Sequence, residues 1–231
     1  MGISVVSAAS FRTYVSENSI ASAFNDNSSD PSKPPFTAFP QIAGTIPLPT
    51  TLGGVSVTID DQTVPLFFVS PGQVNFYVPY GFGPGLHSVR ITNQSGQIWS
   101  TSQMLCVANA VATFTADATG TGNAAVVWLV IRASGTQGYY APGNRPALNP
   151  SDIVYLVAFA TGVVDRDVTL ILNNGRRYGG QSYDVPGMTG LQQQNFRIPL
   201  NDLWNNALGG YIQVRNANGT FDGNGVDWPR F

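Results

Sequence analysis

The chain has 231 residues, of which 43% are hydrophobic, enough to bury a core and too many for a disordered protein. Asp, Glu, Lys and Arg make up only 10% of it, and the formal net charge is −2. The cations are scattered, so the basic patch that neutralises phosphates is missing and we expect no nucleic-acid partner.

The remaining residue types predict an all-β protein. Lys33 is the only lysine and Glu17 the only glutamate, and these two residue types normally coat surface helices. Gly, Pro, Ser, Thr and Asn are abundant instead, as in turns and on the solvent faces of strands. No run approaches the roughly 18 apolar residues of a transmembrane helix, so no membrane span is expected.

The start of the chain predicts no signal peptide, because residues 1–4 contain neither a basic region nor a long apolar run. A cytoplasmic protein and a mature exported domain that begins with a new Met-Gly both fit this start. The surface chemistry favours the second, so we expect a secreted or cell-surface protein. The single cysteine, Cys106, excludes an internal disulfide, and its apolar neighbours predict a buried, inert thiol.

From residue 45 onward, short strands alternate with turns. Residues 55–59 alternate apolar and polar side chains, Asp60-Asp61-Gln62 makes a turn, and 64–69 returns as the next strand. Further strands are predicted over 74–78, 88–92 and a run that ends at 107. This spacing of turns is typical of a sandwich. Residues 25–50 are rich in Pro, Ser and Asp and are expected to form a long loop or irregular arm.

The second half follows the same pattern. Residues 124–131 are expected to form a strand buried on both faces, and 132–150 a second long loop. Residues 168–172 form a strand that Asn174-Gly175 should close with a type I′ turn. A helical turn over 201–207, capped by Asn201, is also expected.

An internal repeat supports two domains. The segment Gln73–Pro79 reads Gln-Val-Asn-Phe-Tyr-Val-Pro, and Gln193–Pro199 reads Gln-Gln-Asn-Phe-Arg-Ile-Pro. Each copy follows a strand–turn–strand unit and precedes a glycine-bearing turn and an alternating strand, which indicates a duplication. The sequence therefore predicts two tandem immunoglobulin-like antiparallel β-sandwich domains, over residues 1–112 and 113–231.

The same motifs resemble a known family, the uncharacterised C-terminal region of large acidobacterial secreted proteins. The resemblance rests on residues 6–11, 47–55 and 68–75, and more loosely on 160–162 and 195–199. It is weakest around 132–150. It implies export from a bacterial cell, tandem β-sandwiches and no assigned activity, and it transfers no catalytic residue.

Catalytic chemistry finds little support. A protease-like triad needs a histidine, and His87 is the only one, without a Gly-x-Ser-x-Gly motif. Paired carboxylates for glycoside hydrolysis would have to come from Asp60-Asp61 or from Asp165 and Asp167, which solvated turns explain as well. We expect no enzyme and no catalytic residue. A hydrolase built on His87 or an Asp pair is kept as the second alternative.

Two binding sites are considered. The C-terminal segment brings Asn218, Asp222, Asn224 and Asp227 together at alternating spacing with glycines, so calcium is a candidate cofactor, although ordinary hairpin turns have the same composition. Tyr139 and Tyr140 form an aromatic pair in a Gly/Pro-rich segment and could stack on sugars. Of the tryptophans at 99, 128, 204 and 228, Trp128 is expected in the core.

These observations favour a non-catalytic extracellular module with a structural, adhesion or assembly role. A carbohydrate-binding module that uses exposed aromatics is the alternative. The expected partners are other copies of the chain or a cell-surface glycan or protein, because a chain with so few charges does little to protect the edges of its sheets.

Overall fold

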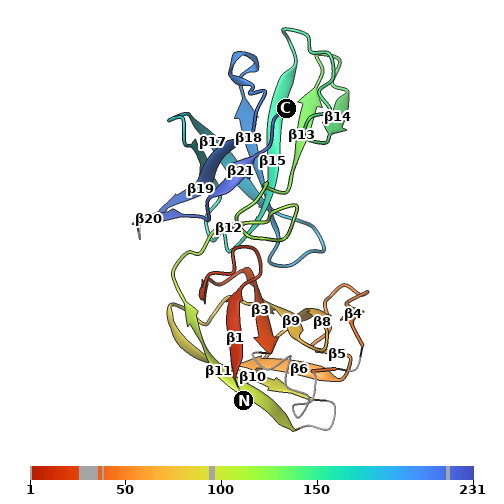
Figure 1. The fold of residues 1–231 in the computed structure, drawn as a ribbon, viewed down its shortest axis with the longest axis vertical. Helices are drawn as coiled ribbons and strands as arrows, with labels where there is room; N and C mark the ends of the chain where they lie inside the picture. Colours follow the sequence, from red (N-terminus) through yellow and green to blue (C-terminus); the bar gives the residue numbers. More distant parts are fainter. Residues whose placement is uncertain (1, 26–35, 38, 94–96, 217–218) are drawn as a thin grey trace. The chain divides into compact units, whose positions relative to one another are not determined.

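A computed structural model describes residues 2–25, 36–37, 39–93, 97–216 and 219–231. The chain divides into two compact units (Figure 1). Unit 1 comprises Met1–Asn109 and Pro186–Gly190, and unit 2 comprises Ala110–Val185 and Leu191–Phe231. The all-β fold with antiparallel sheets is confirmed, and it is consistent with the expected tandem β-sandwiches. The described residues contain no α-helix, and no helix among them is long and apolar enough to cross a membrane.

Unit 1 contains the strands β1 Ile3–Ser7, β2 Tyr14–Val15, β3 Ser19–Asn25, β4 Gln41–Ile42, β5 Thr51–Leu52, β6 Val55–Ile59, β7 Gln62–Thr63, β8 Leu66–Val69, β9 Gln73–Val78, β10 Gly85–Thr92 and β11 Ile98–Cys106. One sheet has the order β1-β3-β9-β8-β4, and the facing sheet has the order β2-β11-β10-β6-β5, with β7 paired to β6. All pairs are antiparallel except β2 with β11.

The core of unit 1 lies between these sheets, because each strand buries alternate side chains. Val74, Phe76 and Val78 of β9 are fully buried, as are Val57 and Ile59 of β6 on the facing sheet. The period-2 pattern that predicted these strands is thus confirmed.

The long arm expected over residues 25–50 is only partly described, since residues 26–35 and 38 lie outside the described chain. Within the described part, β4 pairs with β8 through Gln41 and Val69 and so lies at the edge of the first sheet. This pairing covers one of the sheet edges of unit 1.

Unit 2 contains β12 Ala112–Thr113, β13 Val126–Ile131, β14 Gln137–Tyr140, β15 Ile153–Thr161, β16 Asp167–Leu172, β17 Arg177–Asp184, β18 Gln192–Ile198, the 3-10 turn η1 Leu200–Asp202, β19 Leu208–Asn216, β20 Gly219–Asp222 and β21 Val226–Trp228. These strands form a hydrogen-bonded sheet of the order β14-β13-β15-β18-β17-β16-β19-β20, and β12 and β21 pair with β15 and β19.

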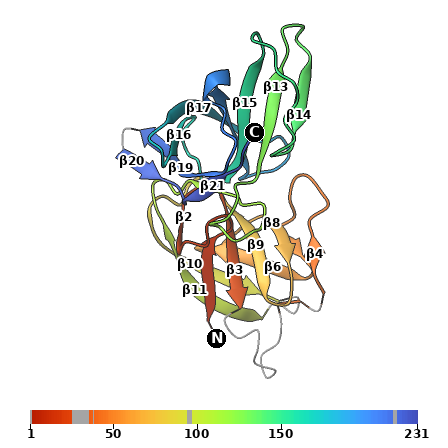
Figure 2. The same cartoon turned by 45° about the horizontal axis from the view of Figure 1, so that its top comes forward.

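The sheet of unit 2 closes on itself. β21 pairs with β19, and Asn123, just before β13, forms a bridge with Asp227 of β21. The Ala124 N–H donates to the Asp227 carbonyl at 2.8 Å. Strands β16, β17, β19 and β21 therefore curl around the interior (Figure 2). The bridge connects the two ends of the curled sheet, while β14 and β20 remain its edge strands.

Aromatic rings fill the interior of unit 2. Trp128, Phe196 and Trp228 are fully buried, and Trp128 packs against Trp204 with 5.2 Å between ring centroids. The expected core position of Trp128 is confirmed. The expectation that its strand is buried on both faces is wrong, because β13 alternates buried and half-buried side chains.

Two local predictions are also corrected. The hairpin between β16 and β17 has Gly175 in the left-handed region at φ 88°, but Asn174 is not left-handed, so the turn is not type I′. The Gly175 N–H donates to the Leu172 carbonyl instead. The helical turn is short, Leu200–Asp202, and Pro199 occupies its N-cap position without a side-chain hydrogen bond.

The repeated motif occupies equivalent strands, β9 and β18. In both copies the phenylalanine is fully buried, and the glutamine amide donates to the asparagine oxygen two residues later, at 2.7 Å in β9 and 2.8 Å in β18. The shared residues thus serve the sheet: the ring fills the core, and the Gln–Asn pair lies on the opposite face of the strand.

Candidate functional site

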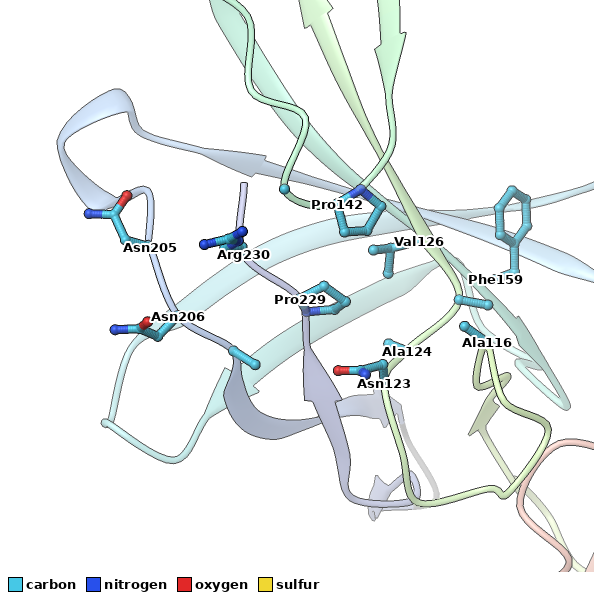
Figure 3. Close-up of a pocket in the computed structure, with 13 residues that line it drawn as sticks. Ala116, Asn123, Ala124, Val126, Pro142, Phe159, Asn205, Asn206, Pro229 and Arg230 are labelled. Carbon is cyan, nitrogen blue, oxygen red and sulfur yellow. The ribbon is translucent and has the colours of Figure 1, made fainter.

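Unit 2 contains a pocket of about 720 Å³ (Figure 3). Such a volume is typical of small-molecule sites. Its lining comes from separate stretches of the chain: Ala116, Asn123, Ala124, Ala125, Val126, Pro142, Gly143, Phe159, Asn205, Asn206, Ala207, Pro229 and Arg230.

The C-terminal segment that forms one wall is held by buried indoles. The Trp204 N–H donates to the Pro229 carbonyl at 3.0 Å, and the Trp128 N–H donates to the Arg230 carbonyl at 3.2 Å. Phe231 packs on Trp128 with 4.7 Å between ring centroids. The Gly143 N–H also donates to the Arg230 carbonyl, which links the Pro142 loop to the same wall.

The lining contains four polar side chains, Asn123, Asn205, Asn206 and Arg230, among apolar residues and glycine, and Asn123 lies beside Pro229 (Figure 3). Asn205, Asn206 and Arg230 stand on one side of the pocket in Figure 3, and Pro142, Val126 and Pro229 lie next to them toward its middle. Phe159 lies on the far side. The side chains of Asn205, Asn206 and Arg230 make no hydrogen bond with another described residue. The pocket therefore offers amide and guanidinium donors beside an apolar surface.

The lining contains no Asp, Glu, His or Cys. Proton transfer and nucleophilic attack in proteins depend mainly on those side chains.

The residues considered for hydrolysis are engaged elsewhere. His87 Nδ1 lies 2.6 Å from Asp60 Oδ2, and its Nε2 lies 3.0 Å from the Gly83 carbonyl, so both ring nitrogens face acceptors and neither faces a nucleophile. The hydrogen bond with His87, assisted by one from the Ser88 N–H, lowers the pKa of Asp60. Asp61 binds Arg90 instead, at 2.6 Å.

The Asp60-Asp61 turn explains these partners. Both residues are left-handed, with φ of 46° and 66°, as the central residues of a type I′ hairpin turn require. The other pair is not assembled for catalysis either. Asp165 accepts a hydrogen bond from the Arg166 N–H, and Asp167 begins β16 at an exposed position.

The calcium candidates do not share one position. Asn218 lies outside the described residues, and Asp222 accepts a hydrogen bond from Gln213 at 2.7 Å. Asn224 is buried, and its oxygen accepts the Thr113 N–H at 2.7 Å. Asp227 is exposed on β21. The described residues contain no cluster of three or more His, Cys, Asp or Glu side chains that could hold a metal.

The two tyrosines point to opposite faces of β14. Tyr139 is 65% exposed, whereas Tyr140 packs against the core of unit 2. Successive strand residues alternate in this way, so the two rings cannot form one flat surface. Trp204 and Trp228 are buried and are equally unable to stack on a sugar.

Cys106 is buried as expected, and burial raises its pKa to about 11. Such a thiol is protonated at neutral pH and unreactive.

Sequence reasoning missed the pocket, because Asn205, Pro142 and Arg230 lie in three distant segments without a shared motif. The Asn205-Asn206 doublet beside a buried tryptophan was the one local signal of an exposed polar turn.

The comparison with family models agrees with an immunoglobulin-like β-sandwich. A family model described as IPT/TIG domain matches residues 47–105, which lie in unit 1. This match supports a β-sandwich family and covers less than half of the chain. The comparison with curated proteins gives no match.

Among solved structures, the chain is similar to the Bacteroides ovatus protein SGBP-B of a mixed-linkage glucan utilization locus, in complex with a mixed-linkage heptasaccharide. The identity is 12% and the TM-score 0.35, over 94% of this chain and 44% of that one. The chain thus spans less than half the length of that protein, and a likeness at this level carries no functional argument.

Proposed function

We propose that the protein is a non-catalytic extracellular module that binds a saccharide in the pocket of unit 2. The observation that carries the proposal is the lining itself: Asn205, Asn206 and Arg230 without partners among the described residues, beside Pro142, Pro229 and other apolar groups. Sugars present hydroxyls that pair with amide and guanidinium groups, and C–H faces that pack on apolar surfaces.

The lack of acids in the lining supports a binding role over hydrolysis. Glycoside hydrolysis normally uses two carboxyl groups about 5 to 9.5 Å apart. The pocket lining offers none, and His87 belongs to the other unit.

A glycan array followed by calorimetry tests this function. The Arg230→Ala variant removes the guanidinium and keeps the backbone carbonyl that accepts the Trp128 N–H, so the pocket wall should persist. We expect at least a tenfold loss of affinity, about 1.4 kcal/mol. The double variant Asn205→Ala/Asn206→Ala should lose as much.

Arg166→Ala is the matched control, since Arg166 is exposed in unit 2 and outside the lining. Its affinity should equal that of the unmodified chain. A glycan that binds the Arg230→Ala variant unchanged would place the site elsewhere, and an array without any binding would favour the structural or adhesion role.

Exposed apolar side chains in unit 1 favour that second candidate, adhesion or self-assembly. Leu86 is 70% exposed and pairs in register with Leu105, which is 40% exposed. Light scattering after size exclusion should then give a mass above the 24.6 kDa of one chain that grows with concentration. Export and kinship with the acidobacterial family belong to the same proposal, which the native gene's upstream sequence tests.

A further inference from the structure

Unit 2 carries a second concave feature, separate from the pocket of Figure 3. It is a shallow groove of about 270 Å³ on the outer face of β15, β17 and β18. Its lining is Tyr155, Gly179, Gly180, Gln181, Tyr183, Asn195 and Arg197. None of these residues lines the larger pocket.

Gly179 lines the groove without a side chain. A Cβ built on Gly179 would meet no atom within 4 Å, so the fold does not require glycine there. The next residue differs, because a Cβ on Gly180 would lie 2.6 Å from the Asn195 carbonyl oxygen and 2.5 Å from the ring of Phe196. Gly180 allows β17 to pack closely against β18, whereas the missing side chain of Gly179 leaves the groove open.

Tyrosine rings and amides form the walls. Tyr183 is 44% exposed, and its hydroxyl donates to the Gln181 oxygen at 2.7 Å. The Asn195 oxygen accepts the Gln193 amide at 2.8 Å. Both bonds use the amide oxygens, so the NH₂ groups of Gln181 and Asn195 are left as hydrogen-bond donors.

Arg197 supplies the charge. It is exposed opposite Tyr155 in the β15–β18 register, and its guanidinium makes no hydrogen bond or ion pair with another described residue. No acid lines the groove. The acid nearest in register is Asp167, opposite Gln181. The repeat places Tyr77 at the corresponding position of unit 1, so the cation is specific to the second copy.

We infer that this groove binds a carboxylate-bearing saccharide such as a uronic-acid oligomer. The Arg197 guanidinium pairs with the sugar carboxylate, a contact that is often bidentate. The tyrosine rings pack on the sugar face, and the amide NH₂ groups donate to its hydroxyls. This site is independent of the saccharide pocket, because the two share no residue.

Calorimetry of the intact chain with an oligogalacturonate tests the inference, with the methyl-esterified oligomer as the uncharged probe. We expect binding of the acid form and at least tenfold weaker binding of the ester. Arg197→Gln should lower the affinity at least tenfold. Arg197→Lys should lower it less, because lysine keeps the positive charge but cannot make the bidentate contact of a guanidinium. Asp167→Asn should tighten binding.

Gly179→Leu provides a test by filling the groove. It should abolish binding with an unchanged or raised melting temperature, because the position is open and leucine suits a strand better than glycine. Arg230→Ala, which removes the guanidinium of the pocket, should bind the oligogalacturonate normally, so failure of this site and of the pocket are distinguishable. Equal binding of acid and ester, no binding of either, or unchanged binding by Arg197→Gln or Gly179→Leu overturns the inference.

Discussion

At the scale of single residues, the hydrogen bonds of one side chain, Asn224, show that the C-terminal segment has a structural role. Asn224 is buried, and its amide accepts the Thr113 N–H and donates to the Thr113 and Gly120 carbonyls, at 2.7, 3.0 and 2.8 Å. The residue thus ties the end of unit 2 to its beginning. Its spacing with Asp222 and Asp227 resembles a calcium loop, but Asn224 is buried whereas Asp222 and Asp227 are exposed.

Asn224→Ala should therefore destabilise unit 2 by about 3 kcal/mol, because buried backbone groups lose their partners. Asn149→Ala, at an exposed position of the same unit, should change little. Urea unfolding of both variants, with calcium and with a chelator, measures the effect. A loss of stability that appears only in calcium would restore the calcium hypothesis.

The Asp60–His87 contact predicts a pH dependence. The pKa of Asp60 is lowered in the folded state, so its contribution to stability is present above the unfolded pKa of about 3.9 and is lost as the pH falls through the folded value. Asp60→Asn should flatten the acid limb of the melting temperature below about pH 4. Asp61→Asn, in the same turn, is the control, and an equal flattening there would contradict the assignment.

At the scale of elements, the segment before the repeated motif differs between the two units. In unit 1, Pro65 separates β7 from β8, which belong to different sheets. In unit 2 the corresponding strand, β17, is continuous: residues 177–181 pair with β16, and residues 180–184 pair with β18. The break in unit 1 contains Pro65, and the continuous strand of unit 2 contains the pair Gly179-Gly180.

Gly180→Ala should cost about 2 kcal/mol, since the new methyl group meets backbone. Gly179→Ala should instead stabilise by about 0.5 kcal/mol, because alanine loses less backbone entropy than glycine. Chemical denaturation of the pair measures both changes. Equal effects would contradict the difference in packing between these two positions.

Strands with strict alternation, such as β6 and β9, could be predicted from the sequence, because one face is core and the other is not. β3 was missed, because its buried positions hold small or polar residues while the large apolar Ile20 and Phe24 are only half-buried, so hydrophobicity does not alternate along the strand. The closure through Asn123 and Asp227 was also out of reach, because it joins positions about a hundred residues apart with ordinary turn chemistry. The pocket could not be predicted for the same reason, because its lining residues are also distant in the sequence.

At the scale of the molecule, the expected boundary between residues 112 and 113 stays a prediction, while the compact units meet between Asn109 and Ala110. If each unit folds as a domain, calorimetry should show two transitions. Phe76→Ala should lower one and Phe196→Ala the other, each by about 4 kcal/mol, because both rings are fully buried in separate cores. Variants that shift a single common transition would indicate one cooperative unit.

The central claim is that the pocket of unit 2 binds a saccharide and leaves it intact. The most direct measurement is an NMR titration of the intact, isotope-labelled chain with the strongest glycan from the array, followed over time. We predict shifts of the side-chain amide signals of Asn205 and Asn206 and of residues around Arg230, with the glycan signals unchanged in number. Shifts confined to other residues, or new reducing-end signals from a cleaved glycan, would contradict the account.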